Sequence, residues 1–165
     1  MNPINKKESS QRLSRLQQTI RELKADACLI STTVNQFYLL GFIFDGYVFV
    51  QPEGDPVLFV KRPSGIKGDN ITYIRKPEQL PDLLHQKKIP LPRRLMVEND
   101  VLPFSTVSRL QTALEMPELI NVSGEMRRIR SVKSEFEIKQ IRECADIHAL
   151  VYKQIPHIYS KGMTD

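Results

Sequence analysis

Apolar residues recur with a helical period at both ends of the chain. Near the N-terminus they are spaced three or four positions apart, at Leu13, Leu16, Ile20 and Leu23. This spacing predicts an amphipathic helix over residues 8–24. A longer stripe near the C-terminal end has the same period and an oppositely placed charged face, and it comprises Ile138, Ile141, Cys144, Ala145, His148, Val151, Tyr152, Ile155 and Tyr159. It predicts a second amphipathic helix.

The second helix has a clear start signal. Ser134 precedes the stripe and Glu137 follows three residues later, which is the spacing of a capping box. Pro156 lacks a backbone N–H and clashes with the preceding turn, so it predicts a kink or an early end. Gly162 is the predicted terminator.

Short β-type runs alternate with helical segments in the middle of the chain. Strands are predicted over residues 27–31, 47–50, 57–61, 72–75, 95–98 and 119–122, and helices over 35–40, 77–86 and 104–114. The sequence PEGDP between the second and third strands favours an antiparallel hairpin. Residues 63–70 lack the GxxxxGK[ST] pattern of a phosphate loop and are predicted to form a surface turn. The order of elements predicts an α/β fold, with a mixed β-sheet flanked by helices.

Length and composition favour one packed domain with an appendage. The chain has 165 residues, of which 41% are hydrophobic and 26% charged. Basic and acidic residues are interspersed, so the net charge of +5 predicts a solvated surface and no nucleic-acid partner. The alternative is a basic RNA or DNA binder, whose affinity would fall steeply with salt. No run is apolar enough for a leader or a membrane span, so we expect a cytoplasmic protein. Cys28 and Cys144 are predicted to be buried thiols.

The residue pattern provides few candidates for catalysis. Cys144 and His148 are one helical turn apart, but two ligands are too few for a closed zinc site. Neither GxSxG nor a cysteine with a partnering base occurs. A nuclease would need converging carboxylates on strands, and the available acids, Asp26, Asp45, Glu98 and Asp100, are not expected to converge. The sequence therefore predicts neither a catalytic nor a metal site in these residues.

Three separated motifs carry a family resemblance. The pattern RxxKSxxEIxxIR over residues 130–142, with GMTD at 162–165, resembles the domain junction of the creatinase, prolidase and aminopeptidase P family. The sequence NQFYLLGF at 35–42 resembles the family's NxxYLxGF, and VENDVL at 97–102 resembles its VExDxL segment. The resemblance implies a ribonuclease H-like, creatinase-type N-terminal domain over residues 1–130. Residues 131–165 would be a linker and first helix leading into a catalytic domain.

The resemblance also implies what the domain does. Members of the family are metallopeptidases that hydrolyse the bond preceding proline, with two divalent metal ions, manganese or cobalt, held in the catalytic domain. The present chain is then expected to be inactive alone. Its implied role is subunit association and one wall of a cleft for short proline-containing peptides, so its partners would be its own catalytic domain and a second subunit. Dipeptidase, aminopeptidase and creatinase chemistry are not distinguished. Alternatives are a stand-alone protein-interaction module and a creatinase-like protein without metals.

Two sets of residues are candidates for contacts. By position, the loop after the YLxGF motif resembles one that faces the partner's active site, which makes Asn35, Tyr38 and Asp45 candidates for an interface or a cleft. The alternatives are a simple β-turn at Asp45 and a core position for Tyr38. The second set is the exposed apolar stripe of the C-terminal helix, which is expected to drive self-association and includes Ile138, Ile141, Ala145, His148, Tyr152 and Ile155.

Overall fold

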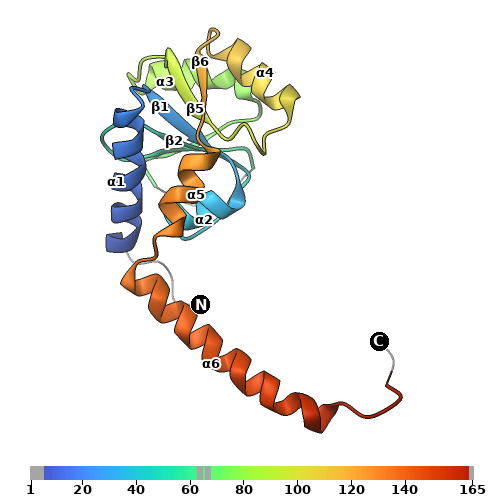
Figure 1. Ribbon diagram of the computed structural model, residues 1–165. Coiled ribbons are helices and arrows are strands. Elements are labelled where there is room, and N and C mark those ends of the chain that lie inside the picture. The colour runs from blue at the N-terminus through green and yellow to red at the C-terminus, as the bar shows by residue number, and fades with distance from the viewer. Residues whose placement is uncertain (1–5, 63–64, 66–67, 164–165) are drawn as a thin grey trace. The chain divides into compact units, whose positions relative to one another are not determined.

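The computed structural model describes residues 6–62, 65 and 68–163 of the chain. These residues belong to two compact units, Met1–Arg130 and Ser131–Asp165, which are described one at a time (Figure 1). Half of the predicted surface turn at 63–70 lies outside the described residues, as do the last two residues of the GMTD motif.

The first unit is built on a six-stranded sheet with the order β4-β3-β2-β1-β5-β6. Strand β1 pairs antiparallel with β2, and β2 pairs antiparallel with β3, whereas the other neighbours are parallel. The predicted mixed sheet and its hairpin are therefore confirmed. The strands are β1 (Ala27–Ile30), β2 (Gly46–Val50), β3 (Val57–Val60), β4 (Ile71–Tyr73), β5 (Arg94–Val97) and β6 (Glu118–Asn121).

Helices cover both faces of the sheet (Figure 1). Cys28 and Ile30 of β1 face one core cluster, which α1, α2 and α5 complete, while Ala27 and Leu29 face a second cluster with α3 and α4. Burial on both faces explains why β1 reads as an uninterrupted apolar run. The helices are α1 (Lys6–Glu22), α2 (Thr33–Leu40), the 3₁₀ helix η1 (Pro77–Gln79), α3 (Leu80–Gln86), α4 (Phe104–Ala113) and α5 (Ser123–Ser131).

Two details of the first unit differ from the sequence-based expectation. The predicted helix over 77–86 is a 3₁₀ turn followed by α3. Helix α5 was not predicted, because most of its residues are small or charged. It forms because Met126 and Ile129 pack into the core beside Val122.

The second unit contains one long helix, α6 (Glu135–Ile158). Its capping box is confirmed: the Glu137 N–H donates to Ser134 Oγ at 3.2 Å, and the Ser134 N–H donates to Glu137 Oε2 at 2.9 Å. The helix continues through Pro156, so it does not end early there, and the alternative expectation of a kink stays a prediction. The last turn is still closed by the Tyr159 N–H, which donates to the Ile155 carbonyl.

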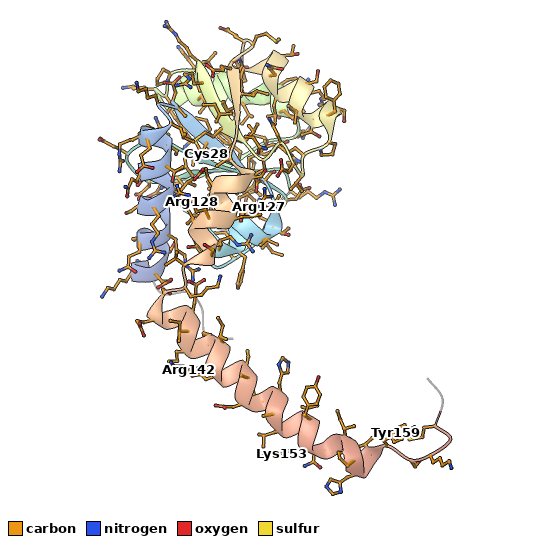
Figure 2. All side chains as sticks on the ribbon, viewed as in Figure 1. Cys28, Arg127, Arg128, Arg142, Lys153 and Tyr159 are labelled. Carbon is orange, nitrogen blue, oxygen red and sulfur yellow. The ribbon has the colours of Figure 1, made fainter. Side chains whose placement is uncertain are left out.

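The helix ends before the predicted terminator. Tyr159 is extended, with φ of −75° and ψ of 132°, so α6 ends at Ile158, four residues before Gly162. No residue of α6 is buried, and its side chains project from all sides (Figure 2). The predicted burial of Cys144 is therefore wrong, whereas that of Cys28 is confirmed. None of the helices in the described part of the chain is long and apolar enough to cross a membrane.

Candidate functional site

An open cleft of about 670 Å³ lies where β1 and β5 end. These strands are parallel neighbours, so the segments that follow them emerge at the same edge of the sheet. The loop between α2 and β2 and the end of β3 complete the walls. The lining residues are Ser31, Thr32, Thr33, Ile43, Phe44, Asp45, Gly46, Tyr47, Lys61, Val101, Leu102, Pro103 and Thr106.

Behind the Ser31 and Thr32 wall of the cleft lies the carboxylate of Glu98, which is 1% exposed. Its Oε2 accepts the backbone N–H groups of Ser31 and Thr32 at 2.6 and 2.8 Å. The hydroxyls of the same two residues also donate to this carboxylate. Asn35 Nδ2 donates to Oε1 at 2.6 Å. Glu98 therefore ties the end of β5 to the end of β1 and the start of α2.

This arrangement makes Glu98 a structural acceptor. Thr32, at the N-cap of α2, makes no side-chain cap of its own, because its hydroxyl donates to the Glu98 carboxylate, as does its backbone N–H. Burial raises the pKa of the Cys28 thiol well above its usual value, and the nearby negative charge of Glu98 adds to the shift. A thiol kept protonated is a poor nucleophile. Neither side chain is free for catalysis.

Asn35 and Tyr38, both candidates from the sequence, point into the first unit. Asn35 is 7% exposed, and its Oδ1 accepts a hydrogen bond from Arg130 Nη1 at 3.2 Å. The Tyr38 ring belongs to the core and lies 4.3 Å from the guanidinium carbon of Arg12. The Tyr38 hydroxyl donates to the Ile129 carbonyl at 3.4 Å. Their contribution to an interface stays a prediction.

Asp45 is the sequence candidate that lines the cleft. It is exposed and lies 3.4 Å from Lys61 Nζ and 3.9 Å from Arg62 Nε. The Lys61 ammonium also sits 4.7 Å from the centroid of the Tyr47 ring. The cleft therefore carries a balanced charge pair on its polar side. Asp45 lies in a bend that leads into β2, and its proposed role toward a partner stays a prediction.

The loop that carries Asp45 is fixed by a buried amide. Gln36 Nε2 donates to the Gly46 carbonyl at 3.1 Å, and the Phe44 N–H donates to Gln36 Oε1 at 3.1 Å. A Cβ at Gly46 would lie 2.0 Å from the Phe59 carbonyl oxygen. Only glycine allows β2 and β3 to approach so closely at this point. The polar wall of the cleft is therefore rigidly held.

The carboxylates considered for a nuclease do not converge. Asp26 precedes β1 and accepts the backbone N–H groups of Arg93 and Arg94, at the opposite end of the strands from Glu98. Asp100 pairs with Asn121 and Arg127 on the surface. Among the described residues, no group of three or more His, Cys, Asp or Glu side chains could hold a metal ion. These residues do not fit the metal pair that the family resemblance implies.

The residues of the C-terminal stripe lie on one surface of α6. Ile138 is half-buried, while the others, Ile141, Ala145, His148, Tyr152 and Ile155, are exposed. Sequence reasoning missed the apolar residues beside the cleft of the first unit, Val34, Ile43, Val101 and Phe104. They come from three separate segments that only the folded sheet brings together, so periodicity gave no signal for them.

The fold and the sequence both match known proteins. A family model described as the creatinase/prolidase N-terminal domain matches residues 12–132. An uncharacterized peptidase of Staphylococcus saprophyticus is 26% identical over 150 residues, which cover 81% of the chain and 41% of the relative. The chain thus spans about two fifths of the length of the curated relatives it matches.

Solved structures show the same fold. The Xaa-Pro dipeptidase from Bacillus anthracis matches with a TM-score of 0.76 and 19% identity, over 94% of the chain and 45% of the dipeptidase. The N-terminal domain of the cytoplasmic peptidase PepQ from Mycobacterium tuberculosis matches with a TM-score of 0.57 and 23% identity, over 72% of the chain and 98% of that domain. The chain belongs to the creatinase/prolidase N-terminal domain family.

Proposed function

We propose that the chain is the non-catalytic N-terminal domain of a proline-specific metallopeptidase, a Xaa-Pro dipeptidase or aminopeptidase. The observation that carries the proposal is that Glu98 and Cys28, two side chains of this domain that could react, are hydrogen-bonded or buried. Glu98 accepts five hydrogen bonds from its neighbours, and Cys28 is buried with a raised pKa. The described residues contain no cluster of metal ligands. An enzyme of this family that contains such a domain must carry its catalytic residues in another domain.

The domain supplies one wall of the substrate cleft. The wall is the loop between α2 and β2, which Gln36 and Gly46 hold in place. Asp45 and Lys61 offer both signs of charge to the two termini of a short peptide, and Ile43 offers an apolar surface to its side chains. Short proline-containing peptides have these features.

The partners are the domain's own catalytic domain and a second subunit. The Bacillus anthracis dipeptidase supports this proposal, because the match leaves more than half of that chain uncovered. Two divalent metal ions, manganese or cobalt, would be bound in the catalytic domain and would activate a water molecule for hydrolysis. We place the protein in the cytoplasm, as the name of the Mycobacterium tuberculosis relative indicates for that peptidase.

The first test is activity and metal binding of the 165-residue chain. We expect no hydrolysis of Xaa-Pro dipeptides with added Mn²⁺ or Co²⁺ and no metal binding by calorimetry. Turnover that chelation abolishes would contradict the non-catalytic assignment.

The second test uses the full product of the gene. It should hydrolyse Xaa-Pro peptides in the presence of Mn²⁺ or Co²⁺. Removing the apolar contact with Ile43→Ala should raise KM roughly tenfold with little change in kcat. Met116→Ala, which changes an exposed residue away from the cleft, is the control. Equal KM values for both variants would show that the loop between α2 and β2 does not form a wall of the substrate cleft.

A second candidate function is a stand-alone interaction module, or a creatinase-like protein without metals. It is favoured by α6, whose exposed apolar stripe is suited to a helix-binding partner. The full gene product distinguishes the candidates. A product that neither binds Mn²⁺ nor hydrolyses Xaa-Pro peptides would favour the module.

A further inference from the structure

A second pocket lies at the end of the sheet opposite the cleft. Its volume is about 440 Å³, and it lies where β1 and β5 begin and β2 ends. Ala25 and Ala27 line it together with Phe49 of β2. Because the two alanine side chains fill little space beside the Phe49 ring, a hollow with an apolar floor remains at this end of the strands. The proposed function makes no use of this pocket.

The walls of the pocket are held by contacts outside it. On one side, the loop between β2 and β3 is tied to α1. Gln17 Nε2 donates to the Gly54 carbonyl at 2.8 Å, and the Arg21 guanidinium donates to the carbonyl of Pro52, a lining residue. On the other side, residues 89–92 contain two prolines, whose rings restrict the backbone. A preformed pocket requires little ordering of the protein when a ligand binds.

Three polar side chains at this pocket have groups without a partner in the described part of the chain. Asp26 accepts the backbone N–H groups of Arg93 and Arg94 through Oδ2 alone, so its Oδ1 is unused. The Gln51 amide and the Arg93 guanidinium are also unused by the described residues. In contrast, the guanidinium of the adjacent Arg94 pairs with Glu118 and donates to two backbone carbonyls.

Two of these side chains carry opposite charges and start next to each other. The backbone N–H of Arg93 lies 2.8 Å from Asp26 Oδ2, yet no ion pair within the described residues joins the Arg93 guanidinium to the Asp26 carboxylate. A small molecule that bears both an ammonium and a carboxylate can form a charge-assisted hydrogen bond with each of them. An α-amino acid carries these two groups on a single carbon atom.

We infer that this pocket binds a free α-amino acid with an apolar side chain. The ammonium of the ligand donates to Asp26 Oδ1, and its carboxylate accepts from the Arg93 guanidinium. Its side chain lies on the floor formed by Ala25, Ala27 and Phe49. The inference goes beyond the proposed function and does not depend on it, because the substrate cleft lies at the other end of the strands.

The surroundings of the pocket favour a small molecule over a segment of a partner protein. A protein interface buries roughly 800 Å² on each partner and has an apolar centre. None of the described residues that line this pocket is among the exposed large apolar residues of the chain. The pocket volume of about 440 Å³ lies in the range of small-molecule sites. The apolar surface at this end of the sheet is therefore confined to the hollow.

Titration of the isotope-labelled 165-residue chain with L-leucine, followed by NMR, tests the inference. The backbone amide signals of Asp26, Gln51 and Arg93 should shift, with a dissociation constant on the order of 1 mM. N-acetyl-L-leucine lacks the ammonium and L-leucinamide lacks the carboxylate, so each should bind roughly tenfold more weakly. Glycine lacks the apolar side chain and should also bind roughly tenfold more weakly.

Substitutions at the charged pair provide a second measurement. Arg93→Ala removes an exposed guanidinium but keeps the backbone N–H that Asp26 accepts, so the chain should fold and bind leucine roughly tenfold more weakly. Arg93→Lys keeps the positive charge and should retain most of the affinity. Arg62→Ala removes an exposed arginine at the cleft end of the sheet and is the matched control, with unchanged affinity expected. The amide spectrum of each variant verifies its fold.

The other outcomes contradict the inference in distinguishable ways. An absence of shifts up to about 20 mM leucine, far above the expected dissociation constant, would exclude the site. Equal affinities of leucine and leucinamide, or of the Arg93→Ala variant and the unsubstituted chain, would show that Arg93 holds no carboxylate. Shifts at Asp45 and Lys61 in place of those at Asp26 would move the ligand to the cleft. That result would overturn the inference and leave the proposed function intact, since the peptidase assay is independent of this titration.

Discussion

The two units of this chain are stabilised by different means. The sheet unit buries two apolar clusters, one on each face, and places a hydrogen-bonded carboxylate at the end of its central strands. In contrast, α6 has 24 residues, none of them buried. Its stability comes from local features, namely the capping box and an ion pair of 4.0 Å between Lys139 and Glu143. The comparison separates what a sequence specifies locally from what only tertiary packing provides.

Local features alone stabilise a helix only marginally. Isolated helices in water gain about 0.3–0.5 kcal/mol from an exposed ion pair and about 1 kcal/mol from a cap. The apolar side chains of α6, such as Ile141 at 53% and Tyr152 at 72% exposure, contribute little while they face solvent. We therefore expect the sheet unit to unfold cooperatively. We expect the stability of α6 to change when its own residues are substituted.

The largest expected difference between the units is in thiol reactivity. Cys28 lies in the core, whereas Cys144 is exposed on α6. Reaction of Cys28 requires opening of the sheet unit, which costs several kcal/mol, so its labelling should be more than about a thousandfold slower. The raised pKa of its thiol acts in the same direction.

Mass spectrometry after a maleimide pulse measures this difference. The native chain should take up one label at Cys144 and a second only in urea. The Cys144→Ser variant should stay unlabelled under native conditions. Rapid double labelling would show that the sheet unit opens as readily as α6.

The next largest effect is expected from Glu98→Ala. The substitution leaves the donors of Ser31, Thr32 and Asn35 without their acceptor in a buried position. The expected loss is about 3–5 kcal/mol in the free energy of unfolding, measured by urea denaturation. Glu98→Gln keeps one acceptor oxygen but directs an NH₂ group toward other donors, so an intermediate loss is expected.

Glu118→Ala is the matched control for Glu98→Ala. Glu118 lies at the start of β6 and pairs with Arg94, but its side chain is 62% exposed. Its removal should change the free energy of unfolding by less than about 0.5 kcal/mol. Similar losses for Glu98 and Glu118 would mean that the buried carboxylate is not a central support of the sheet unit.

The same contrast explains what the sequence could predict. The start of α6 was predicted at the correct residue, because Ser134 and Glu137 interact within one turn. The hairpin of β2 and β3 was predicted from its short connection. Helix α5 was missed, because its apolar residues Met126 and Ile129 are significant only when the core is present to receive them.

The limit of prediction from the sequence is clearer still at the cleft. Glu98 was considered as a nuclease carboxylate and as part of the VExDxL motif, but not as a buried acceptor, because nothing in its neighbourhood along the chain indicates donors from residues more than sixty positions away. The burial predicted for Cys144 was wrong for the complementary reason. A helical stripe shows which residues share a face, but not whether another element covers that face.

A smaller effect, confined to the second unit, is expected from Ser134→Ala. Loss of the cap should destabilise the first turn of α6 by about 1 kcal/mol. Amide hydrogen exchange at Glu137 should become faster, because its N–H loses Ser134 Oγ as acceptor. The urea midpoint of the sheet unit should not change. Ser160→Ala, which alters a serine beyond the helix, is the control, and a shifted midpoint would show that the two units unfold together.

The smallest expected effect is the pH response of Asp100, on the surface of the sheet unit. The hydrogen bond from Asn121 lowers the pKa of Asp100, and Arg127 lowers it further. Because the folded-state pKa is depressed, the stabilisation is fully present above the unfolded value near 3.9 and is lost as the pH falls through the folded value. Asn121→Ala should therefore raise the pKa of Asp100, as measured by NMR titration of its carboxyl carbon. Arg128→Ala removes the neighbouring arginine, which pairs with Glu125 instead, and should leave the titration unchanged. An unchanged pKa of Asp100 in Asn121→Ala would mean that the hydrogen bond from the Asn121 amide is not what lowers this pKa. Contacts of Asp100 with other residues would then have to account for the shift.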